Sequence, residues 1–279
     1  MNYLLYNPLS SNGKGTAIKD EAILSLRDRF QEFTEINVLE LDKEEFILQL
    51  KEEDIVVLVG GDGTLNHFAN AVYELNVKNK IYLYRAGTGN DFSRDISLEG
   101  DLIDLKPYLS KLPKIRVNGK VSYFINGIGY GIDGMVCEVA DNLRSQGIKD
   151  INYTKIAIRL LMMKYKRPNA KVLVDGKEFR FKKVWFASSM NGQYYGAGMM
   201  VAPGQNRLTD DLTFVTVQKL GRLRALMIFP SIFKGEHIKK TNNCIMIKGK
   251  HIEVYFSKPM ALQIDGEVVR NVTHYEVFK

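Results

Sequence analysis

Three short segments in the first hundred residues combine glycine with hydroxyl, amide and carboxylate side chains. They are Asn7-Pro8-Leu9-Ser10-Ser11-Asn12-Gly13-Lys14-Gly15, Gly60-Gly61-Asp62-Gly63-Thr64-Leu65-Asn66 and Gly87-Thr88-Gly89-Asn90-Asp91-Phe92. Glycine lets the backbone approach a phosphate closely, and the free N–H groups at the start of a following helix favour an anion. The hydroxyl groups add further donors. The segments therefore predict phosphate binding, although none has the P-loop spacing.

Asp62 is the residue in these segments whose presence most needs a chemical reason. A carboxylate beside phosphate-binding amides is repulsive unless it serves a metal ion, a proton or a hydroxyl group. The alternative is structural, because aspartate is a common helix N-cap and Asp62 precedes an expected helix. The residues alone leave both interpretations open.

Each glycine segment follows a short apolar run that is typical of a buried strand. We expect strands at 3–6, 36–41, 54–59 and 80–84, and helices at 16–33, 44–51 and 65–75. Strands that alternate with helices predict a parallel sheet covered on both faces. Ligands bind such sheets at the carboxyl ends of the strands, which is where all three segments lie.

The pattern changes after about residue 113, where strands become denser and hairpin signals appear. Asn118-Gly119 and Asp175-Gly176 are typical of two-residue hairpin turns. Further strands are expected at 184–188, 212–217, 252–256, 260–264 and 274–279, with a helix at 153–165. The chain therefore predicts an α/β domain over 1–113 followed by a mostly antiparallel β domain.

Composition excludes several classes of protein. The 279 residues are 45% apolar and 25% charged, which is typical of a globular chain and not of a disordered, collagen-like or coiled-coil one. No stretch approaches the roughly 18 apolar residues of a membrane span, and residues 1–8 lack the charge pattern of a signal peptide. We therefore expect a cytoplasmic protein.

The charge balance favours anionic partners. Lys and Arg number 39 and Asp and Glu 32, so the formal net charge is +7. This charge suits nucleotides, nucleic acid or an anionic membrane without choosing among them. Two cysteines far apart in the chain predict no disulfide framework, and the histidines and cysteines show no zinc spacing.

With these motifs, the chain resembles the diacylglycerol kinase catalytic family, in particular its soluble bacterial lipid kinases. The second glycine segment resembles the family signature Gly-Gly-Asp-Gly-Thr. Other matching segments follow in the family's order over nearly the whole chain: Asn7-Pro8 with Ser10, Ser11 and Gly13; Gly87 to Arg94; Gly129-Tyr130-Gly131-Ile132-Asp133; Gly196-Ala197-Gly198-Met199 with Ala202-Pro203; and Asp265-Gly266-Glu267.

The resemblance implies a fold and a nucleotide site. The first domain would hold ATP, residues 114–269 would form a β-sandwich that presents a lipid hydroxyl, and a strand at 270–279 would return to the first domain. The residues implied to bind ATP are Asn7, Pro8, Ser10, Ser11, Gly60, Gly61, Asp62, Gly63, Thr64, Asn66, Gly87, Thr88 and Asn90.

The resemblance also implies catalytic roles. Glu267 would be the general base on the lipid hydroxyl, and Asp62 would help to organise Mg²⁺ and the phosphates. Asp210 would mark an additional Mg²⁺ site, completed by main-chain oxygens near 207 and 212. Arg94 and Asp133 would belong to a charged network that ties the sites together.

The implied activity is an ATP- and Mg²⁺-dependent lipid kinase of phospholipid metabolism that converts a diacylglycerol-like lipid to phosphatidic acid. Its partners would be a lipid alcohol and an anionic membrane surface, contacted peripherally and transiently, and not nucleic acid. The basic segments 155–167 and 219–240 mix cations with apolar residues and could meet a membrane, although core-packed helices would look the same. The oligomeric state is not indicated.

Several alternatives remain open at this stage. NAD kinases share the Gly-Gly-Asp-Gly-Thr loop, but they are expected to carry an Asn-Glu-x-Asp motif downstream, which we do not find. Asn90-Asp91-Phe92 instead favours the lipid kinase branch. A sphingoid or other lipid alcohol could be the acceptor. A catalytically silent nucleotide- or lipid-binding relative is suggested by departures from the family pattern.

These departures are His67 where the family has Glu, Asp211 where it has Gly, and Arg85-Ala86 where Pro is common. In addition, Asp265-Gly266 has the same pattern as Asp175-Gly176, so Glu267 is also consistent with an ordinary hairpin residue.

Overall fold

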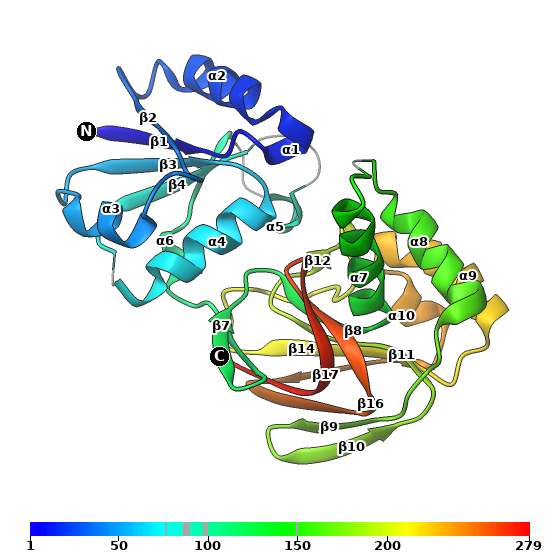
Figure 1. The fold of residues 1–279 in the computed structure, drawn as a ribbon. Helices are drawn as coiled ribbons and strands as arrows, with labels where there is room; N and C mark the ends of the chain where they lie inside the picture. The colour runs from blue at the N-terminus through cyan, green and yellow to red at the C-terminus, as the bar shows by residue number, and fades with distance from the viewer. Residues whose placement is uncertain (76, 86–89, 97–99, 149) are drawn as a thin grey trace. The chain divides into compact units, whose positions relative to one another are not determined.

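The structure is a computed structural model of the chain, and it describes residues 1–279 except 76, 86–89, 97–99 and 149. The chain divides into two compact units, Met1–Leu112 and Pro113–Lys279 (Figure 1). This division falls one residue before the domain boundary expected from the sequence. The two units are described separately.

The first unit is built on a five-stranded sheet with the order β2-β1-β3-β4-β5. The strands are β1 Asn2–Tyr6, β2 Thr34–Asn37, β3 Ile55–Val59, β4 Lys80–Tyr84 and β5 Leu102–Asp104. All neighbours are parallel except β5, which runs antiparallel to β4. The central β3 is almost wholly buried, as expected of a strand covered on both faces. The predicted parallel sheet is confirmed, with one antiparallel edge strand added.

Helices flank this sheet. They are α1 Ser10–Gly13, α2 Gly15–Leu26, α3 Lys43–Gln49, α4 Asp62–Val72, η1 Tyr73–Leu75, α5 Asp91–Asp95 and α6 Lys106–Leu109. In Figure 1, α2 lies on one side of the sheet and α3 and α4 on the other. The helix expected over 16–33 ends early, at Leu26. Phe30 turns into the core there and packs against Phe33 and Tyr82, with ring centroids 5.3 and 6.5 Å away.

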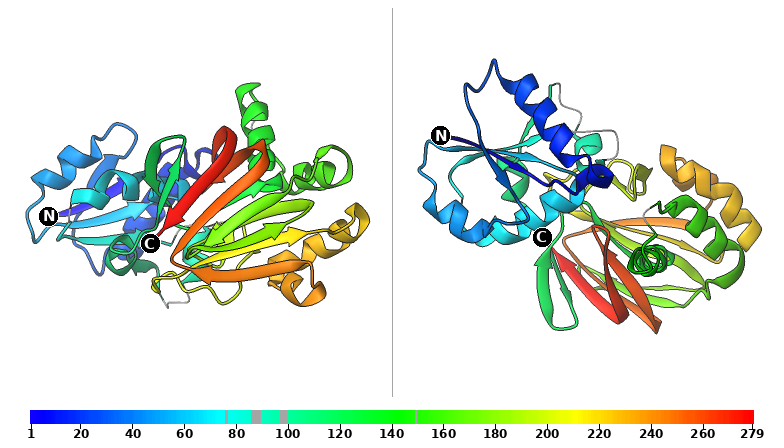
Figure 2. Two further views of the ribbon diagram at one scale, coloured as in Figure 1. Left: turned by 90° about the horizontal axis from the view of Figure 1, so that it is seen from below. Right: turned by 45° about the horizontal axis from the view of Figure 1, so that its top comes forward.

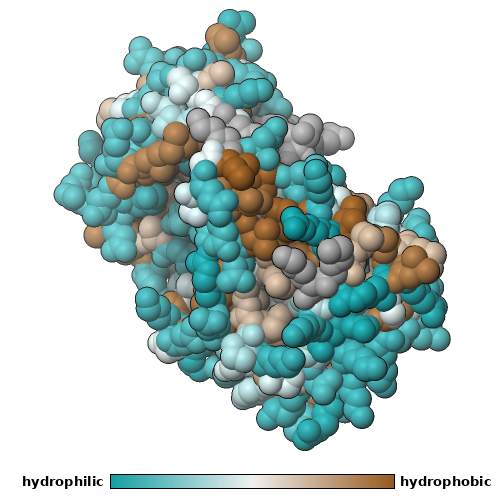
Figure 3. Space-filling model, turned by 45° about the vertical axis from the view of Figure 1, so that its right-hand side comes forward, coloured by the Kyte–Doolittle hydropathy of each residue, from teal (hydrophilic) through white to brown (hydrophobic). Residues whose placement is uncertain are grey.

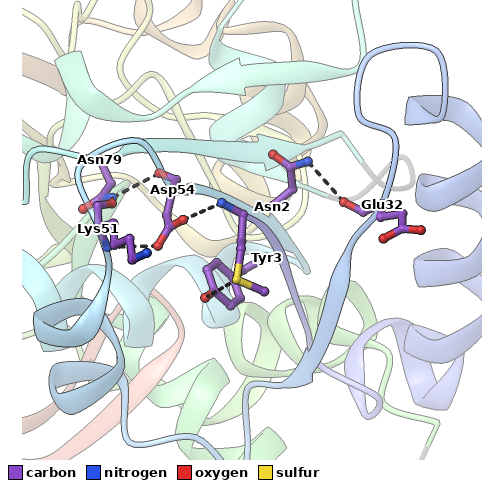
Figure 4. A network of polar contacts seen from close by, with 7 residues as sticks. Asn2, Tyr3, Glu32, Lys51, Asp54 and Asn79 are labelled. Carbon is purple, nitrogen blue, oxygen red and sulfur yellow. Dashed lines mark hydrogen bonds and ion pairs between the residues drawn. The ribbon is translucent and has the colours of Figure 1, made fainter.

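A buried aspartate fixes the amino ends of the strands (Figure 4). Asp54 is 4% exposed, and its carboxylate accepts hydrogen bonds from the Met1 amino group at 2.5 Å and from Lys51 N at 2.9 Å. The Asn79 amide donates to the carbonyl oxygens of Lys51 and Asp54. The bond from the Met1 amino group keeps the pKa of Asp54 below its ordinary value. These contacts therefore hold the amino ends of β1, β3 and β4 together.

The second unit is dominated by an antiparallel sheet with the order β15-β14-β11-β8-β16-β17-β6-β7, to which β9 adds through β16 and β10 through β9. The strands are β6 Lys114–Val117, β7 Lys120–Tyr123, β8 Gly127–Gly131, β9 Ala170–Val174, β10 Lys177–Phe181, β11 Val184–Met190, β14 Leu212–Gln218, β15 Cys244–Gly249, β16 His251–Ile264 and β17 Glu267–Phe278. A separate pair joins β12 Tyr194–Tyr195 to β13 Met199–Met200. Figure 2 shows the long strands β16 and β17 side by side.

Several short helices accompany this sheet. They are α7 Ile132–Ser145, α8 Tyr153–Arg159, the π-helical turn η2 Leu160–Lys164, α9 Arg222–Ile228, the 3-10 segment η3 Phe229–Lys234 and α10 His237–Lys240. The helix expected over 153–165 is therefore α8 continued by a π turn. It ends at Tyr165, which is buried and stacked on Trp185 at 5.7 Å. No helix in the described part of the chain is long and apolar enough to cross a bilayer.

Hairpin turns in the second unit follow the predicted chemistry. Asn118-Gly119, Asp175-Gly176 and Asp265-Gly266 all have positive φ angles, as a type I′ turn requires. The expectation for 270–279 needs correction. This segment lies in β17, which pairs with β16 and with β6, both of them strands of the second unit rather than the first. Strand β6 follows the boundary directly and extends the sheet at the edge of β17.

Candidate functional site

The first and second glycine segments follow neighbouring strands of the first unit. Asn7 follows β1 and Gly60 follows β3, and these strands are parallel and adjacent. The next strand, β4, also runs parallel to β3, and Asn90 lies beyond it at the start of α5. Gly87 and Thr88 lie outside the described residues. The carboxyl ends of β1, β3 and β4 thus share one edge of the sheet, as the sequence predicted.

Asn7 joins the first segment to the second. Its side-chain amide donates to the Thr64 hydroxyl at 3.1 Å, and its backbone N–H donates to Val59 O at 3.4 Å. Its side-chain oxygen accepts from Leu9 N at 3.0 Å, which turns the chain after Pro8. The helix α1 then begins at Ser10, with Ser11 exposed and in a left-handed conformation.

Asp62 joins the second segment to the third. Its two carboxylate oxygens accept hydrogen bonds from Asp91 N at 2.8 Å and Phe92 N at 3.0 Å, the first two N–H groups of α5. The N-cap of α4 is Gly61, so the interpretation of Asp62 as the cap of its own helix is wrong. The sequence did not reveal this contact, since its partners lie 29 and 30 residues away.

Two further side chains hold α5, one at its start and one towards its end. The Asn90 side-chain oxygen accepts from Ser93 N at 3.1 Å, and Arg85 donates to the carbonyl oxygens of Ser93 and Ile96 at 2.8 and 2.6 Å. Asn90 is 6% exposed, and its amide nitrogen has no hydrogen-bond partner among the described residues. Arg85, a departure from the family pattern, therefore holds the later part of α5 and the residue that follows it.

The glycines of these segments fall into two groups. A Cβ atom at Gly15 would lie 1.9 Å from Asn7 O, and one at Gly60 would lie 2.6 Å from the Thr64 side chain, so both glycines serve packing. A Cβ atom at Gly61 or Gly63 would meet no described atom within 4 Å. These two glycines leave open space beside the first turn of α4, whose N–H groups favour an anion.

Two other residues of this unit were singled out from the sequence. Asn66 is buried in α4, and the Asn70 amide donates to both its backbone and its side-chain oxygen. His67, one position on, is exposed. Arg94 lies in the last turn of α5 with its side chain exposed.

In the second unit, Glu267 follows a firmly anchored hairpin turn. The Asp265 carboxylate accepts hydrogen bonds from Ile125 N, Asn126 N and Gly127 N at 2.5 to 2.9 Å. Gly266 N donates to the side-chain oxygen of Gln263 at 2.7 Å. Glu267 itself is exposed at the first position of β17. The turn is therefore rigid, and its carboxylate at 267 faces solvent.

Asp133 has a different environment at the start of α7. Its carboxylate accepts hydrogen bonds from the Ser188 hydroxyl at 3.1 Å and from the Tyr195 hydroxyl. Burial raises the pKa of Asp133 to about 6, although both hydrogen bonds act in the opposite direction. Ser188 and Tyr195 were missed, since no sequence signal links them to Asp133. The predicted network of Arg94 and Asp133 stays a prediction, since these residues belong to different units.

Asp210 lies in the turn that precedes β14. Its side chain is 63% exposed, and its carboxylate lies 3.7 Å from the Lys250 ammonium. Among the described residues, no group of three or more His, Cys, Asp or Glu side chains could hold a metal ion. The Mg²⁺ site at Asp210 stays a prediction.

Two family models match the chain. The diacylglycerol kinase catalytic domain matches residues 2–116, and the YegS C-terminal NAD kinase beta sandwich-like domain matches residues 126–276. A diacylglycerol kinase of Mycobacterium tuberculosis (strain H37Rv) is 25% identical over 282 residues, which covers 95% of this chain and 90% of the relative. A diacylglycerol kinase of Staphylococcus carnosus (strain TM300) is 28% identical over 225 residues, 78% of this chain and 71% of the relative.

Solved structures share the fold. A diacylglycerol kinase from Bacillus anthracis superposes with a TM-score of 0.65 at 18% identity, covering 100% of this chain and 93% of its own. Yeast NADH kinase in complex with NADH superposes with a TM-score of 0.51 at 11% identity, and the match covers 100% of this chain and 80% of the kinase chain. The architecture is thus an N-terminal α/β domain followed by a β sandwich-like domain, as expected.

Proposed function

Because the chain belongs to the diacylglycerol kinase catalytic family, we propose that it transfers the γ-phosphoryl group of ATP to the hydroxyl of a diacylglycerol-like lipid. The products would be phosphatidic acid and ADP. The observation that carries this proposal is the joining of the glycine segments at one sheet edge by Asn7 and Asp62. Phosphoryl transfer depends more on such positioning than on covalent chemistry.

The phosphates would lie against the first turn of α4. Gly61 and Gly63 leave room there for close approach, and the Thr64 hydroxyl is oriented by Asn7. The carboxylate of Asp62 accepts hydrogen bonds from α5, which removes part of the repulsion that it would exert on an anion. Mg²⁺ bound with ATP would neutralise charge on the phosphates.

Glu267 would act as the general base. Its carboxylate would accept the proton of the lipid hydroxyl while the hydroxyl oxygen forms a bond to the γ-phosphorus and the bond from that phosphorus to ADP breaks. An exposed carboxylate on a turn anchored by three backbone N–H groups suits this role, because it is both accessible and held in place.

A membrane surface would supply the lipid, and two short helices of the second unit suit it. Three side chains of η2 and α9 are large, apolar and exposed: Met162 is 54%, Leu223 72% and Met227 66% exposed. Arg222 joins these elements by donating to Leu161 O at 2.7 Å and Tyr165 O at 3.0 Å. Figure 3 shows apolar patches on one otherwise largely hydrophilic face of the molecule.

Exposed cations lie on the same or adjoining elements, since Arg224 is exposed on α9 and Lys155 and Arg159 on α8, which leads into η2. Apolar groups among basic ones favour an anionic bilayer. We expect binding to vesicles of phosphatidylcholine with phosphatidylglycerol that weakens as salt rises. Arg159→Glu with Arg224→Glu should reduce sedimentation with the vesicles, and Lys120→Glu, on exposed β7, is the control. Salt-insensitive binding, or equal binding by both variants, would count against this surface.

The acceptor is tested by transfer of labelled γ-phosphate from ATP with Mg²⁺. Diacylglycerol, monoacylglycerol, sphingosine and ceramide are offered in mixed micelles, and NAD is offered in buffer. Asp62→Asn serves as the control, since it keeps the side-chain size but loses the charge that holds α5. We expect labelled phosphatidic acid with the wild type and a strong loss with the variant.

The other outcomes separate the alternatives. Label in sphingosine or ceramide alone would keep the lipid kinase and change its acceptor. Label in NAD alone would move the protein to the NAD kinase branch. ATP binding without transfer to any of these acceptors would favour a silent nucleotide-binding relative and contradict the proposal.

A further inference from the structure

The loop before β14 has its backbone oxygens engaged by donors of the chain itself. Asp211 O accepts from the Gln205 side-chain amide at 2.8 Å. Asn206 O accepts from the Thr209 hydroxyl at 2.7 Å and from Thr209 N at 3.1 Å. Arg207 O accepts from the Lys279 ammonium at 2.5 Å. Carbonyl oxygens of such a loop are the ligands that a divalent cation would require.

The Lys279 ammonium donates to neutral oxygens of the kind that a bound cation would use. Besides Arg207 O, it donates to the side-chain oxygen of Asn191 at 2.8 Å. Neither acceptor is a carboxylate, so these contacts are not an ion pair. Lys279 thereby joins the end of β17 to the loop before β14 and to the residue after β11.

Further positive charge lies around the same loop. The Arg207 side chain is 5% exposed and donates to Ile125 O at 3.0 Å and to the Asn126 side-chain oxygen at 3.2 Å. On the solvent side, the Lys250 ammonium lies 3.7 Å from the Asp210 carboxylate. A divalent cation in this loop would be repelled by these positive charges. It would also have to compete for carbonyl oxygens that already accept hydrogen bonds from the chain.

We propose that the Lys279 ammonium takes the place of a divalent cation in the loop of residues 205–211, which therefore holds its conformation without Mg²⁺. The residues around Asp210 do not fit a bound metal ion, because the Arg207 carbonyl oxygen is engaged by an ammonium and the Asp210 carboxylate faces another. The positive charge that the loop needs is built into the chain. This inference is independent of the lipid kinase proposal.

The test measures cation dependence in the absence of nucleotide. Thermal unfolding of the wild type is compared in EDTA and in 10 mM MgCl₂, and Mn²⁺ binding is measured by electron paramagnetic resonance. We expect the same unfolding midpoint in both solutions. We also expect the wild type and Asp210→Ala to bind the same amount of Mn²⁺. Lys279→Met should lower the midpoint by about 4 °C, and Lys279→Arg should recover most of the loss.

Lys248→Met is the matched control. It removes one positive charge near the same loop, but its ammonium lies at 3.5 Å from Gly204 O and does not contact Arg207 O. We expect its midpoint to stay within about 1 °C of the wild type. A wild-type midpoint that rises with Mg²⁺ and loses this rise in Asp210→Ala would overturn the proposal, as would an unchanged midpoint in Lys279→Met. If Lys279→Met does not fold, the Mn²⁺ measurement on the wild type decides.

Discussion

Asp62 in the first unit and Asp265 in the second hold the backbone in the same way. Each lies beside a glycine, and each carboxylate accepts hydrogen bonds from consecutive N–H groups of a distant segment. Asp62 binds those of Asp91 and Phe92, and Asp265 binds those of residues 125–127. Bonds of this charge-assisted kind are stronger than those between neutral groups.

The two regions differ in what lies beside the anchoring aspartate. Next to Asp62, Gly61 and Gly63 leave an open stretch of backbone whose N–H groups suit an anion. Next to Asp265, Glu267 presents an exposed carboxylate that suits a proton. The comparison teaches that the groups next to each anchoring aspartate are distinct from the aspartate itself, so substitutions of these neighbours should change activity with little effect on stability.

The largest expected effect on stability is that of Asp265→Ala, which leaves three backbone N–H groups without their acceptor. We expect the free energy of unfolding to fall by about 4 kcal/mol in urea titrations. Asp175→Ala is the matched variant, because its carboxylate accepts from Lys250 N and His251 N at an exposed hairpin. A loss there of about 1 kcal/mol is expected. Equal losses of unfolding free energy in the two variants would show that the Asp265 carboxylate stabilises its turn no more than the one at the exposed hairpin does.

Asp133 extends the comparison to an aspartate whose partners are hydroxyl groups instead of amides. Burial raises its pKa from 3.8 to about 6, so the folded protein binds a proton more tightly than the unfolded chain does. Stability from this group is complete below about pH 4 and is lost as the pH rises through about 6. The expected loss is on the order of 3 kcal/mol.

The check is the difference in unfolding free energy between the wild type and Asp133→Asn, measured by urea titration at pH 4, 5, 6 and 7. Subtraction removes the contribution of the other titrating groups. We expect the wild type to lose stability relative to the variant between pH 4 and 6. A constant difference over this range would show that the carboxylate ionises as it does in water.

The smallest expected effect on stability is that of Gly63→Ala. Alanine favours helix over glycine, and the added methyl group meets no described atom within 4 Å. We expect the free energy of unfolding to rise by about 0.5 kcal/mol. ATP affinity should nevertheless fall, because the methyl group would occupy the space beside the first turn of α4. Calorimetric titration with ATP that finds unchanged affinity would remove this turn from the nucleotide site.

Much of this arrangement could be predicted from local sequence. Runs of β-branched and apolar residues placed the end of β3 at Val59 and that of β4 at Tyr84, because burial on both faces requires such runs. Asn-Gly and Asp-Gly placed the hairpin turns, because only a few residues tolerate positive φ. The edge that gathers the glycine segments then followed from the parallel order of the strands.

Contacts between distant segments could not be predicted in the same way. Nothing near Asp62 indicates that its partners are the amides of α5, and nothing near Asp133 points to Ser188 and Tyr195. The partners of β17 were not predicted either, since the strand pattern at 274–279 does not identify β16 and β6. Such contacts depend on the packing of the whole unit rather than on local propensity.

The most direct test of the account is phosphate transfer by Glu267→Gln. The substitution keeps size and removes the basic carboxylate at an exposed position, so ATP affinity and the unfolding midpoint should match the wild type. Transfer from ATP to diacylglycerol in mixed micelles should fall by about 100-fold or more. Transfer near the wild-type rate would contradict the account and leave Glu267 as a hairpin residue.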